Sequence, residues 1–499
     1  MLPLLQVPAR DGEWLLHPPV SLIPSCVEKN VQILQQTPIQ IDGMPLPDLR
    51  RLLRQEIAPI LEPPLHNNNH NNLAERIWVV SGHQPELDHP GVWVKHFVLQ
   101  GLSRHLGATP LHLIADHDLP KNNGLLVPRL PLNEGERIVR VPVCYDRADL
   151  LTPYEQRPLY DAELFVEAWN RVQELAGAWG FEPIALHLWP RQPPLQPRLV
   201  EILTKLRRYM EHSWGCINHE LPVSRLAQTR AFRHFANHLL NDLTRFRYLY
   251  NQTLRRFRDP AFTAQPVRSI PELEPDEAPF WELRGQRRFR ATRHSPLTTL
   301  RPRALTLTLF VRLVLGDVFI HGLGGALYDQ ITDALIKDYF GITPPAYLTV
   351  TATLHLPFVA DLGDANPASA DLVRRPPSVL WQQWRDIYWN PQRHLPSDVP
   401  AMALELARRR QHCVQAEPPV HDHQARRQWF QQLRSLTESL RSYVQSNLED
   451  VYHQYLVARK QQQYRQILLR RDYSWVLFPE CKLRPFLTAF LDRRFWGPS

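Results

Sequence analysis

The sequence predicts an α/β protein whose parallel-sheet core carries helical insertions and precedes a C-terminal α-helical coiled coil. Three observations support this fold class. Residues 77–115 and 317–354 each have the order strand, loop, helix, strand, and the largely helical stretch 159–258 separates them. The stretch between Pro419 and Pro479 contains no proline and carries apolar residues at steps of three and four.

The first strand–helix–strand segment begins with the apolar run Ile77–Val80. A helix-like stretch follows at residues 91–105, and a second apolar run follows at residues 111–115. Polar side chains come directly after both strands: His83 and Gln84 after the first, and Asp116, His117 and Asp118 after the second. Because the carboxyl ends of parallel strands meet at the edge where such sheets bind ligands, these side chains predict a site. The alternative is that they only cap loops.

The helical insertion spans about residues 150–270. Its apolar side chains recur at helical spacing, for example at Leu199, Ile202 and Leu206 and again at Phe232, Phe235 and Leu239. Such stripes are typical of helices that pack against a core. We therefore assign them no chemistry.

The second segment repeats the order of the first. A helix is expected at residues 305–315, a short buried strand at Asp317–Ile320, a helix at residues 326–340 and a β-branched strand at Tyr347–Leu354. Between the first strand and the second helix lies the run His321-Gly-Leu-Gly-Gly325. Glycines before a helix let an anion approach its N-terminal N–H groups. The spacing is neither G-x-G-x-x-G nor a Walker loop, so glycines needed only for a tight turn are the alternative.

A coiled-coil seam is predicted in the proline-free stretch, at Trp429, Leu433, Leu436, Leu440, Tyr443, Asn447 and Val451. A polar residue such as Asn447 in a seam sets register and partner number. A shorter helix, Ala401 to His412, precedes the seam, so it can pair as a hairpin or the long helix can dimerise. We expect domains at residues 1–400 (the sheet core with an N-terminal extension), 401–478 (the coiled coil) and 479–499 (a tail that returns to the core).

Composition narrows the class of protein. The 499 residues carry a formal charge of +8, but the basic residues are spread along the chain, and no nucleic-acid-binding motif is present. The five cysteines form no C-x-x-C pair, which argues against a zinc ribbon or a disulfide framework. Neither a secretory signal nor a membrane span is recognisable. We therefore expect a cytoplasmic protein with neither membrane nor nucleic acid as a partner.

The candidate site residues fall into two groups. The expected catalytic residues are His83, His96, Asp116, His117 and Asp118, since imidazoles transfer protons near pH 7 and carboxylates orient them. The expected substrate-binding residues are Gln84, His321, Gly322, Gly324, Gly325 and Tyr328. The same histidines and aspartates could hold a divalent metal, but no compact metal signature is present, so we predict no metal. The site requires that the regions around His117 and His321 line one cavity.

These motifs resemble the cysteine-adding enzyme family of bacillithiol biosynthesis (BshC). That family has Gly-Gln-Gln after its opening strand, where this chain has Gly82-His-Gln84, and a helix histidine that matches His96. Its Glu-Asp-His-Asp resembles Ala115-Asp-His-Asp118. Its later glycine-rich turn resembles Gly322-Leu-Gly-Gly325 with Tyr328, and a terminal coiled coil is shared.

The resemblance implies a Rossmann-like core, a homodimer formed through the coiled coil, and the joining of cysteine to glucosaminyl malate. It also implies nucleotide binding, with ATP or ADP as the candidates. Three departures lie in the predicted pocket: His83 replaces the first Gln, Ala115 replaces the acid, and the Gly-Pro-Gly-Glu run is absent.

We therefore expect a ligase that joins cysteine or a related amino acid to an anionic sugar derivative. The alternatives are a metal-dependent hydrolase that uses the same side chains, and a non-catalytic dimeric scaffold.

Overall fold

The computed structural model describes residues 5–65, 76–131, 137–192, 198–263, 270–358 and 375–497. Its chain divides into two compact units. The core unit comprises residues 1–132, 140–356 and 471–499, and the helical unit comprises residues 133–139 and 357–470. The division after residue 356 lies earlier than the boundary at residue 400 drawn from the sequence, because α13 (Pro377–Trp389) packs along α16 (Gln445–Leu468).

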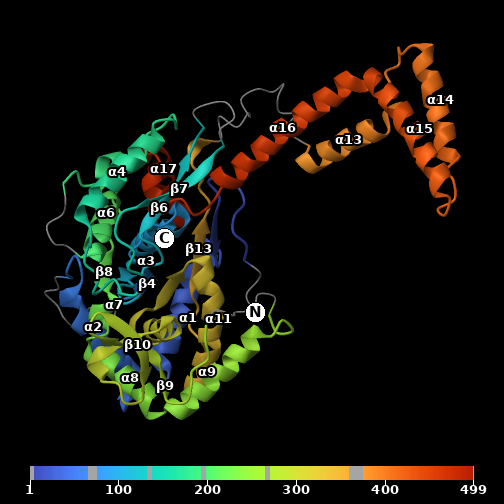
Figure 1. Ribbon diagram of the computed structural model, residues 1–499. Coiled ribbons are helices and arrows are strands. Elements are labelled where there is room, and N and C mark those ends of the chain that lie inside the picture. The colour runs from blue at the N-terminus through green and yellow to red at the C-terminus, as the bar shows by residue number, and fades with distance from the viewer. Residues whose placement is uncertain are drawn as a thin grey trace. The chain divides into compact units, whose positions relative to one another are not determined.

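A six-stranded sheet forms the centre of the core unit (Figure 1). Five of its strands are parallel: β4 (Trp78–His83), β5 (Thr109–Ile114), β8 (His219–Pro222), β12 (Val318–His321) and β13 (Leu348–Ala352). The sixth, β1 (Trp14–His17), pairs antiparallel with β13 at the edge. The order is β1-β13-β12-β4-β5-β8. Strands β5 and β8 therefore follow β4 on one side of the sheet, and β13 follows β12 on the other. This is the strand order of a doubly wound sheet.

Both strand–helix–strand segments found in the sequence are present. The first is β4, α3 (Pro90–Leu106) and β5, and the second is β12, α11 (Leu323–Leu335) and β13. The predicted α/β fold with a parallel-sheet core is thus confirmed. The sequence did not predict β1 or β8, each of which is only four residues long.

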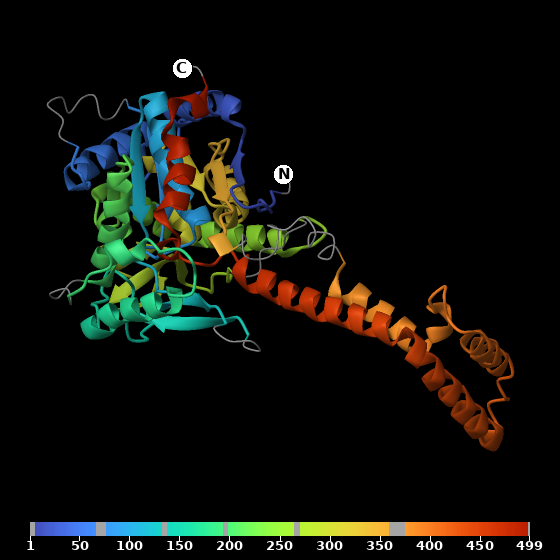
Figure 2. The same ribbon diagram turned by 90° about the horizontal axis from the view of Figure 1, so that it is seen from above.

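Helix α3 packs tightly against one face of the sheet. A Cβ atom at Gly91 would clash with the backbone carbonyl of Ala352 in β13, and one at Gly101 would clash with the carbonyl of Phe490. Two glycines therefore let α3 approach the sheet on one side and the C-terminal segment on the other. Helix α17 (Glu480–Thr488) runs beside α3 there, as Figure 2 shows.

The opposite face is covered by α2 (Leu46–Ile57), α8 (Arg230–Asn241), α9 (Leu243–Arg258), α10 (Ala304–Phe310) and α11. Their apolar side chains form a hydrophobic core with Trp78, Val80 and Leu113 from the sheet. Side chains alternate along a strand, so Ser81 and His112 point to the α3 side, where their side chains bond to each other at 2.9 Å. The two faces of the sheet thus carry different chemistry.

The remaining elements of the core unit flank this sheet. They are α1 (Ile23–Gln36), β2 (Gln40–Ile41), β3 (Met44–Pro45), β6 (Gly124–Arg129), β7 (Val139–Cys144), α4 (Ala162–Ala176), α5 (Ala185–Leu188), α6 (Leu199–Ser213), α7 (Val223–Leu226), β9 (Glu277–Arg284), β10 (Arg287–Thr292) and β11 (Leu300–Pro302). The helical insertion therefore contains the strand β8. None of the helices in the described ranges combines the length and the apolar character that crossing a bilayer requires.

Two helix pairs lie in the described residues of the helical unit. Helix α14 (Ala401–Gln415) pairs with α15 (His423–Arg441), and α13 pairs with α16. The intramolecular hairpin, one of the two kinds of pairing that the sequence left open, is therefore present. A 3-10 turn at Ser442–Val444 interrupts the expected long helix, and the described residues show no coiled coil.

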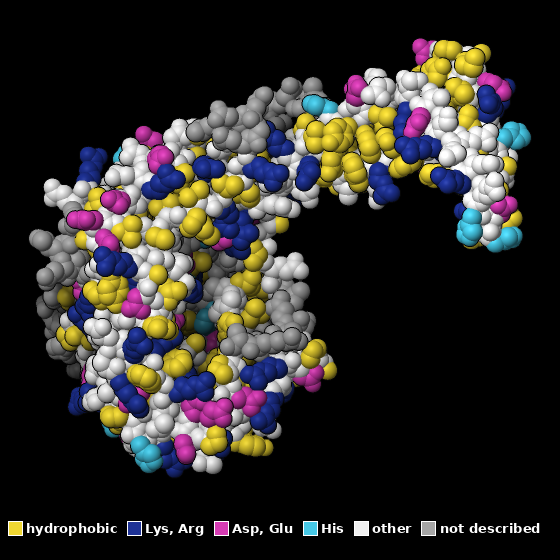
Figure 3. All heavy atoms as spheres, viewed as in Figure 1, with side chains coloured by type: hydrophobic (Ala, Val, Ile, Leu, Met, Phe, Trp, Pro, Cys, Tyr) yellow, Lys and Arg dark blue, Asp and Glu magenta, His cyan; other side chains and the backbone are white. Residues whose placement is uncertain are grey.

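The interruption also changes which side chains are buried. Val444, Leu448 and Val451 pack on Ile387, whereas Asn447 is exposed. The seam therefore continues one residue away from the predicted Tyr443 and Asn447, because the turn alters the helical phase. Figure 3 shows a hydrophobic patch on the helical unit. The exposed apolar side chains of α13 and α16 include Trp381, Trp389, Tyr452, Leu456 and Val457.

Candidate functional site

A cavity of about 610 Å³ lies at the carboxyl ends of β4 and β12. These strands are neighbours in the sheet but not in the chain, which makes this the topological switch point where doubly wound sheets bind ligands. The volume is in the range of small-molecule sites. Seven of the residues singled out in the sequence line it: His83, Gln84, His321, Gly322, Gly324, Gly325 and Tyr328.

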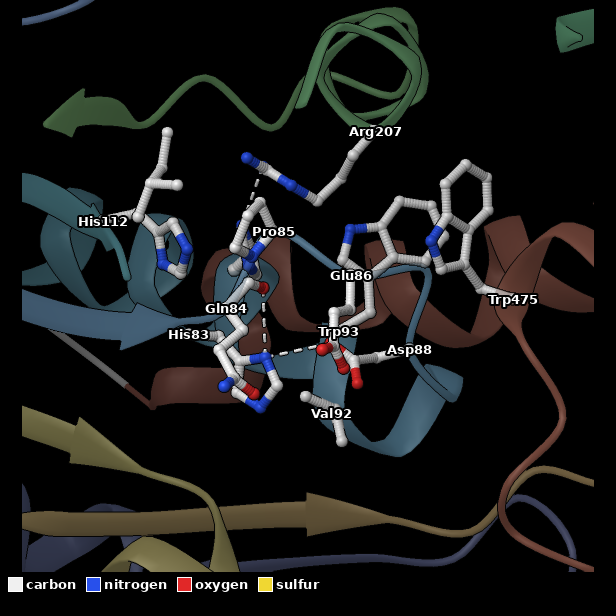
Figure 4. Close-up of a pocket in the computed structure, with 12 residues that line it drawn as sticks. His83, Gln84, Pro85, Glu86, Asp88, Val92, Trp93, His112, Arg207 and Trp475 are labelled. Carbon is white, nitrogen blue, oxygen red and sulfur yellow. Dashed lines mark hydrogen bonds and ion pairs between the residues drawn. The ribbon is translucent and has the colours of Figure 1, made fainter. Parts of the chain in front are cut away.

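His83, at the end of β4, is paired with Asp88 in the loop before α3. The Nδ1 atom of His83 lies 2.9 Å from Oδ2 of Asp88, and the imidazole is 25% exposed. Figure 4 shows the two side chains pointing toward each other. Burial acts to raise the pKa of Asp88, but His83, Lys121 and Lys95 outweigh it and lower that pKa. The carboxylate is therefore charged and accepts a hydrogen bond from Nδ1–H of His83, which leaves Nε2 on the side of the ring away from Asp88.

His321, at the end of β12, has a comparable partner on the opposite side of the sheet. Its Nε2 lies 2.7 Å from Oδ2 of Asp329 in α11. Arg312 donates to the same oxygen at 2.8 Å, and Asp329 is 1% exposed. Burial acts to raise the pKa of Asp329, but Arg312 and His321 lower it overall. Asp329 is therefore ionised and accepts a hydrogen bond from Nε2–H of His321, which leaves Nδ1 on the side of the ring away from the carboxylate.

Two cations and no carboxylate line the cavity among the described residues. Lys95 of α3 is 2% exposed, and its Nζ donates to the carbonyl of Gly82 at 3.1 Å. Burial lowers the pKa of Lys95 to about 8. Arg471 donates from Nη2 to the carbonyl of Ala352 at 2.6 Å and to Oγ1 of Thr351 at 3.0 Å. Such a cavity favours an anionic ligand.

The start of α11 adds backbone donors to this lining. Gly322 occupies the N-cap position, and no side chain caps the helix there. The first N–H groups of the helix therefore remain available to an anion. Gly325 lies one turn in, where an added Cβ would stand 2.7 Å from Nδ1 of His321. Glycine at this position thus lets the imidazole lie against the helix.

The residues after β5 are arranged differently. Asp116 accepts hydrogen bonds from the backbone N–H of Ser224 at 2.9 Å and from its hydroxyl at 2.5 Å. Burial raises the pKa of Asp116 to about 6 and lowers that of His117 to about 4. Both side chains are buried, and neither lines the cavity, although Ala115 does. The structure therefore brings His321 together with the start of this loop but not with the imidazole of His117.

Asp118 reaches the cavity indirectly. Its carboxylate is 37% exposed and accepts from Nη1 of Arg288 at 2.6 Å. The side-chain amide of Gln84 donates to its other oxygen, also at 2.6 Å. Asp118 thus fixes the orientation of Gln84, which lines the cavity.

His96 lies in a separate buried cluster beneath the α3 side of the sheet. Its Nδ1 is 3.0 Å from Oε1 of Glu211, and its ring centroid is 3.9 Å from that of His112. Burial lowers the pKa of His96 well below its usual value, so the imidazole is neutral. A much smaller pocket, about 20 Å³, reaches this cluster from His83 (Figure 4).

The same cluster contains a group with metal-ligand geometry. Ligand atoms of His96, Glu211 and Glu220 lie within 4.8 Å of one another. Nη1 of Arg207, however, lies 2.7 Å from both carboxylates and supplies the positive charge that a metal would bring. Within the described ranges, no such group includes His83, Asp116, His117 or Asp118. The charge of the His96 group is therefore already balanced by Arg207.

Several residues of the site were not found from the sequence. They are Asp88, Lys95, Arg312, Asp329 and Arg471. Lys95 offered one signal, because it is one of only seven lysines and adjoins His96. The others are defined by tertiary contacts, for example between residues 312 and 329.

Comparisons with known proteins add little to this picture. No family model matches the chain, and no curated protein does. Among solved structures, the chain is similar to tyrosyl-tRNA synthetase from Archaeoglobus fulgidus complexed with L-tyrosine. The sequence identity is 11%, with 83% of this chain and 100% of that chain covered, and the TM-score is 0.24. A TM-score of this size carries no argument about function. The fold and the cavity define an α/β protein with a doubly wound sheet and a ligand-sized cavity at its switch point.

Proposed function

We propose that this protein is a ligase similar to the BshC family, with a Rossmann-like core. It would join the amino group of cysteine or a related amino acid to an anionic acceptor of the sugar-malate type. The observation that supports this proposal is the cavity at the switch point. It gathers seven residues singled out in the sequence, and among its described lining residues it presents Lys95 and Arg471 without a carboxylate.

The acceptor is the anionic partner, and the cavity offers it three kinds of donor. The first N–H groups of α11 and the ammonium of Lys95 would hold a carboxylate or phosphate group. Gln84, oriented by Asp118, would donate a hydrogen bond to a sugar hydroxyl or accept one from it. His83 and His321 would act on the reacting groups, because both line the same cavity.

A nucleotide is compatible with the same lining. The glycine-rich start of α11 and the cations Lys95 and Arg471 suit a phosphate chain, although the glycine spacing is not that of a nucleotide fingerprint. Bound ATP would supply the free energy of amide-bond formation. The residues of this chain would hold its phosphates and exclude water from the reacting groups.

The helical unit supports a second part of the proposal, a homodimer. Trp381, Trp389 and Tyr452 are exposed on α13 and α16. The Trp381 ring also stacks on Trp384. Large exposed apolar patches mark interaction surfaces in soluble proteins. A second copy of this unit would cover these rings.

The test of function is direct binding. Glucosaminyl malate, cysteine and ATP are each titrated into the purified protein by isothermal titration calorimetry. We expect glucosaminyl malate to bind, and the Lys95→Met variant to bind it at least tenfold more weakly, because an ion pair to a buried charge is lost. The matched control is Lys205→Met, since Lys205 is exposed on α6. Failure of all three compounds to bind the folded wild-type protein rejects this function.

A further inference from the structure

Two histidine–aspartate pairs face one cavity from opposite sides of the sheet. The pair His83–Asp88 belongs to the end of β4, and the pair His321–Asp329 belongs to the end of β12 and to α11. Both imidazoles line the cavity. The sequence singled out the two histidines but neither aspartate.

The strand register explains how two opposed faces serve one ligand. Ile320 pairs with Ser81, which places His321 beside Gly82 and one residue before the level of His83. Ser81 and His83 share the α3 side of β4, whereas Phe319 and His321 share the other side of β12, where Phe319 packs on the main core. The crevice between these strands is open because their helices, α3 and α11, leave toward opposite faces. A ligand in the crevice would therefore lie between the two rings.

The hydrogen bonds fix complementary tautomers. Asp88 engages Nδ1 of His83, which directs Nε2 away from it, and Asp329 engages Nε2 of His321, which directs Nδ1 away from it. Neither outward nitrogen has a hydrogen-bond partner in the described part of the chain. Each imidazole thus has one nitrogen held by a carboxylate and the other available for a proton. This is the arrangement of a general acid or base with its orienting group.

We propose that His83 and His321 form an acid–base pair for acyl transfer to an amine. His83 acts as the base, and His321 acts as the acid. Asp88 and Asp329 are positioning residues. The proposal rests on the proposed function only for the identity of the amine and of the acyl group.

The proton balance of the step is complete for an acyl phosphate as the acyl donor. The amine nitrogen attacks the carbonyl carbon, and a C–N bond forms while the C–O bond to phosphate breaks. Nε2 of His83 takes the proton that the amine loses, and Nδ1 of protonated His321 gives a proton to the departing phosphate. His321 is assigned the acid because it lies against the start of α11, where the departing anion is stabilised. Exchange with water restores both rings.

The first experiment tests whether the two rings share one ligand. Diethyl pyrocarbonate modifies unprotonated, accessible imidazoles, and peptide mass mapping locates them. We expect modification of His83 and His321 in the native protein, slowed at both by saturating inorganic phosphate. His321 is 8% exposed but lines the cavity, whereas His96 and His117 are 4% and 5% exposed and do not line it. His96 and His117 therefore serve as internal controls and should stay unmodified. Protection of one ring without the other, or modification of neither, overturns the proposal.

The second experiment tests the chemical roles. Phosphate release from acetyl phosphate is measured with cysteine as the amine, in the wild type and in the variants His83→Gln, His321→Gln, Asp88→Asn and Asp329→Asn. We expect each histidine variant to lower kcat by about 10²- to 10⁴-fold with little change in KM, and the aspartate variants to shift the pH profile. A wild-type rate that is no higher than the His321→Gln rate overturns the proposal. Neither experiment uses glucosaminyl malate, so failure of the proposed substrate is seen separately.

Discussion

The end of β5 and the paired ends of β4 and β12 carry similar residues but form different surroundings. His117 and Asp116 after β5 are buried, and Ser224 bonds the Asp116 carboxylate. His83 and His321 line an open cavity. Composition at a strand end therefore does not decide whether a histidine is available to a ligand.

Topology explains the difference. Strands β4 and β5 are consecutive in the chain, so helix α3 connects them and packs over both. Strands β4 and β12 are adjacent in the sheet but lie far apart in the chain, and their following helices diverge. An open crevice forms only in the second case. Tests of this comparison should therefore change the cavity without changing the β5 end, or the reverse.

Among the variants that test this comparison, the largest effect is expected at the first turn of α11, where two neighbouring glycines differ. A Cβ at Gly325 would lie 2.7 Å from Nδ1 of His321, whereas one at Gly324 meets nothing within 4 Å. We expect Gly325→Ala to displace the imidazole and lower the acetyl phosphate rate by about 10- to 100-fold, since small misplacements of reacting groups have effects of this size.

Gly324→Ala is the matched control. Gly324 also lines the cavity, but its added Cβ would meet no atom within 4 Å, so the rate should fall less than in Gly325→Ala. The free energy of unfolding should rise by up to about 1 kcal/mol, because alanine favours the helix over glycine. Both variants are compared by initial rates and by urea unfolding. Equal rates for the two variants would show that the contact between Gly325 and His321 is unimportant.

A smaller effect is expected from Lys95. Burial lowers its pKa to about 8, so its charge is present at pH 7 and is lost as the pH rises through 8. We expect phosphate affinity to fall by roughly tenfold per pH unit above that value, and to be lower and independent of pH in this range in Lys95→Met. Isothermal titration calorimetry from pH 7 to 9.5 measures both.

The sign for stability is opposite to that for binding. Folded Lys95 releases its proton near pH 8, whereas the unfolded chain holds it until about 10.5. Below pH 8 the free energy of unfolding therefore carries the whole penalty of burying the charged Lys95. This penalty decreases as the pH rises from about 8 to about 10.5. Lys95→Met should be more stable than the wild type at pH 7. A flat binding profile for the wild type would show that Lys95 does not contact the anion.

The sequence predicted the two strand–helix–strand segments of the sheet, because their strands and helices follow from the order of neighbouring residues. The segments containing β4, α3 and β5, and β12, α11 and β13, follow from apolar runs, glycine turns and helical periodicity. Strand β8 (His219–Pro222) was missed because four residues between helices give no periodic signal. The seam after Ser442 was placed one residue away because a single 3-10 turn changes the phase of a helix.

The site was predictable to the same extent. His321 stands directly after an apolar run and His83 follows one after Ser81 and Gly82, so the sequence located both histidines. Their partners were not predictable, because Asp329 is two helical turns beyond His321 and Asp88 lies in an irregular loop. The closure of the β5 end depends on Ser224, which is 108 residues from Asp116 in the chain.

The smallest expected effect tests that closure. Ser224→Ala removes the hydroxyl that donates to Asp116 at 2.5 Å but keeps the backbone N–H bond at 2.9 Å. Burial raises the folded pKa of Asp116 to about 6, so the carboxyl is neutral at pH 4.5 and mostly charged at pH 7. The stability that Asp116 contributes is therefore full below about pH 4 and falls as the pH rises through 6.

A bond to a charged acceptor is worth more than one to a neutral acceptor, so Ser224→Ala should cost about 1.5–3 kcal/mol of unfolding free energy at pH 7 and about 1 kcal/mol at pH 4.5. Urea unfolding at both pH values measures this, with the exposed Ser25→Ala as control. Phosphate affinity at the cavity should stay unchanged, since the β5 end and the switch point are separate surroundings. A parallel loss of phosphate binding in Ser224→Ala would instead join them into one site, with Asp116 and His117 acting on the ligand through the loop that begins at Ala115.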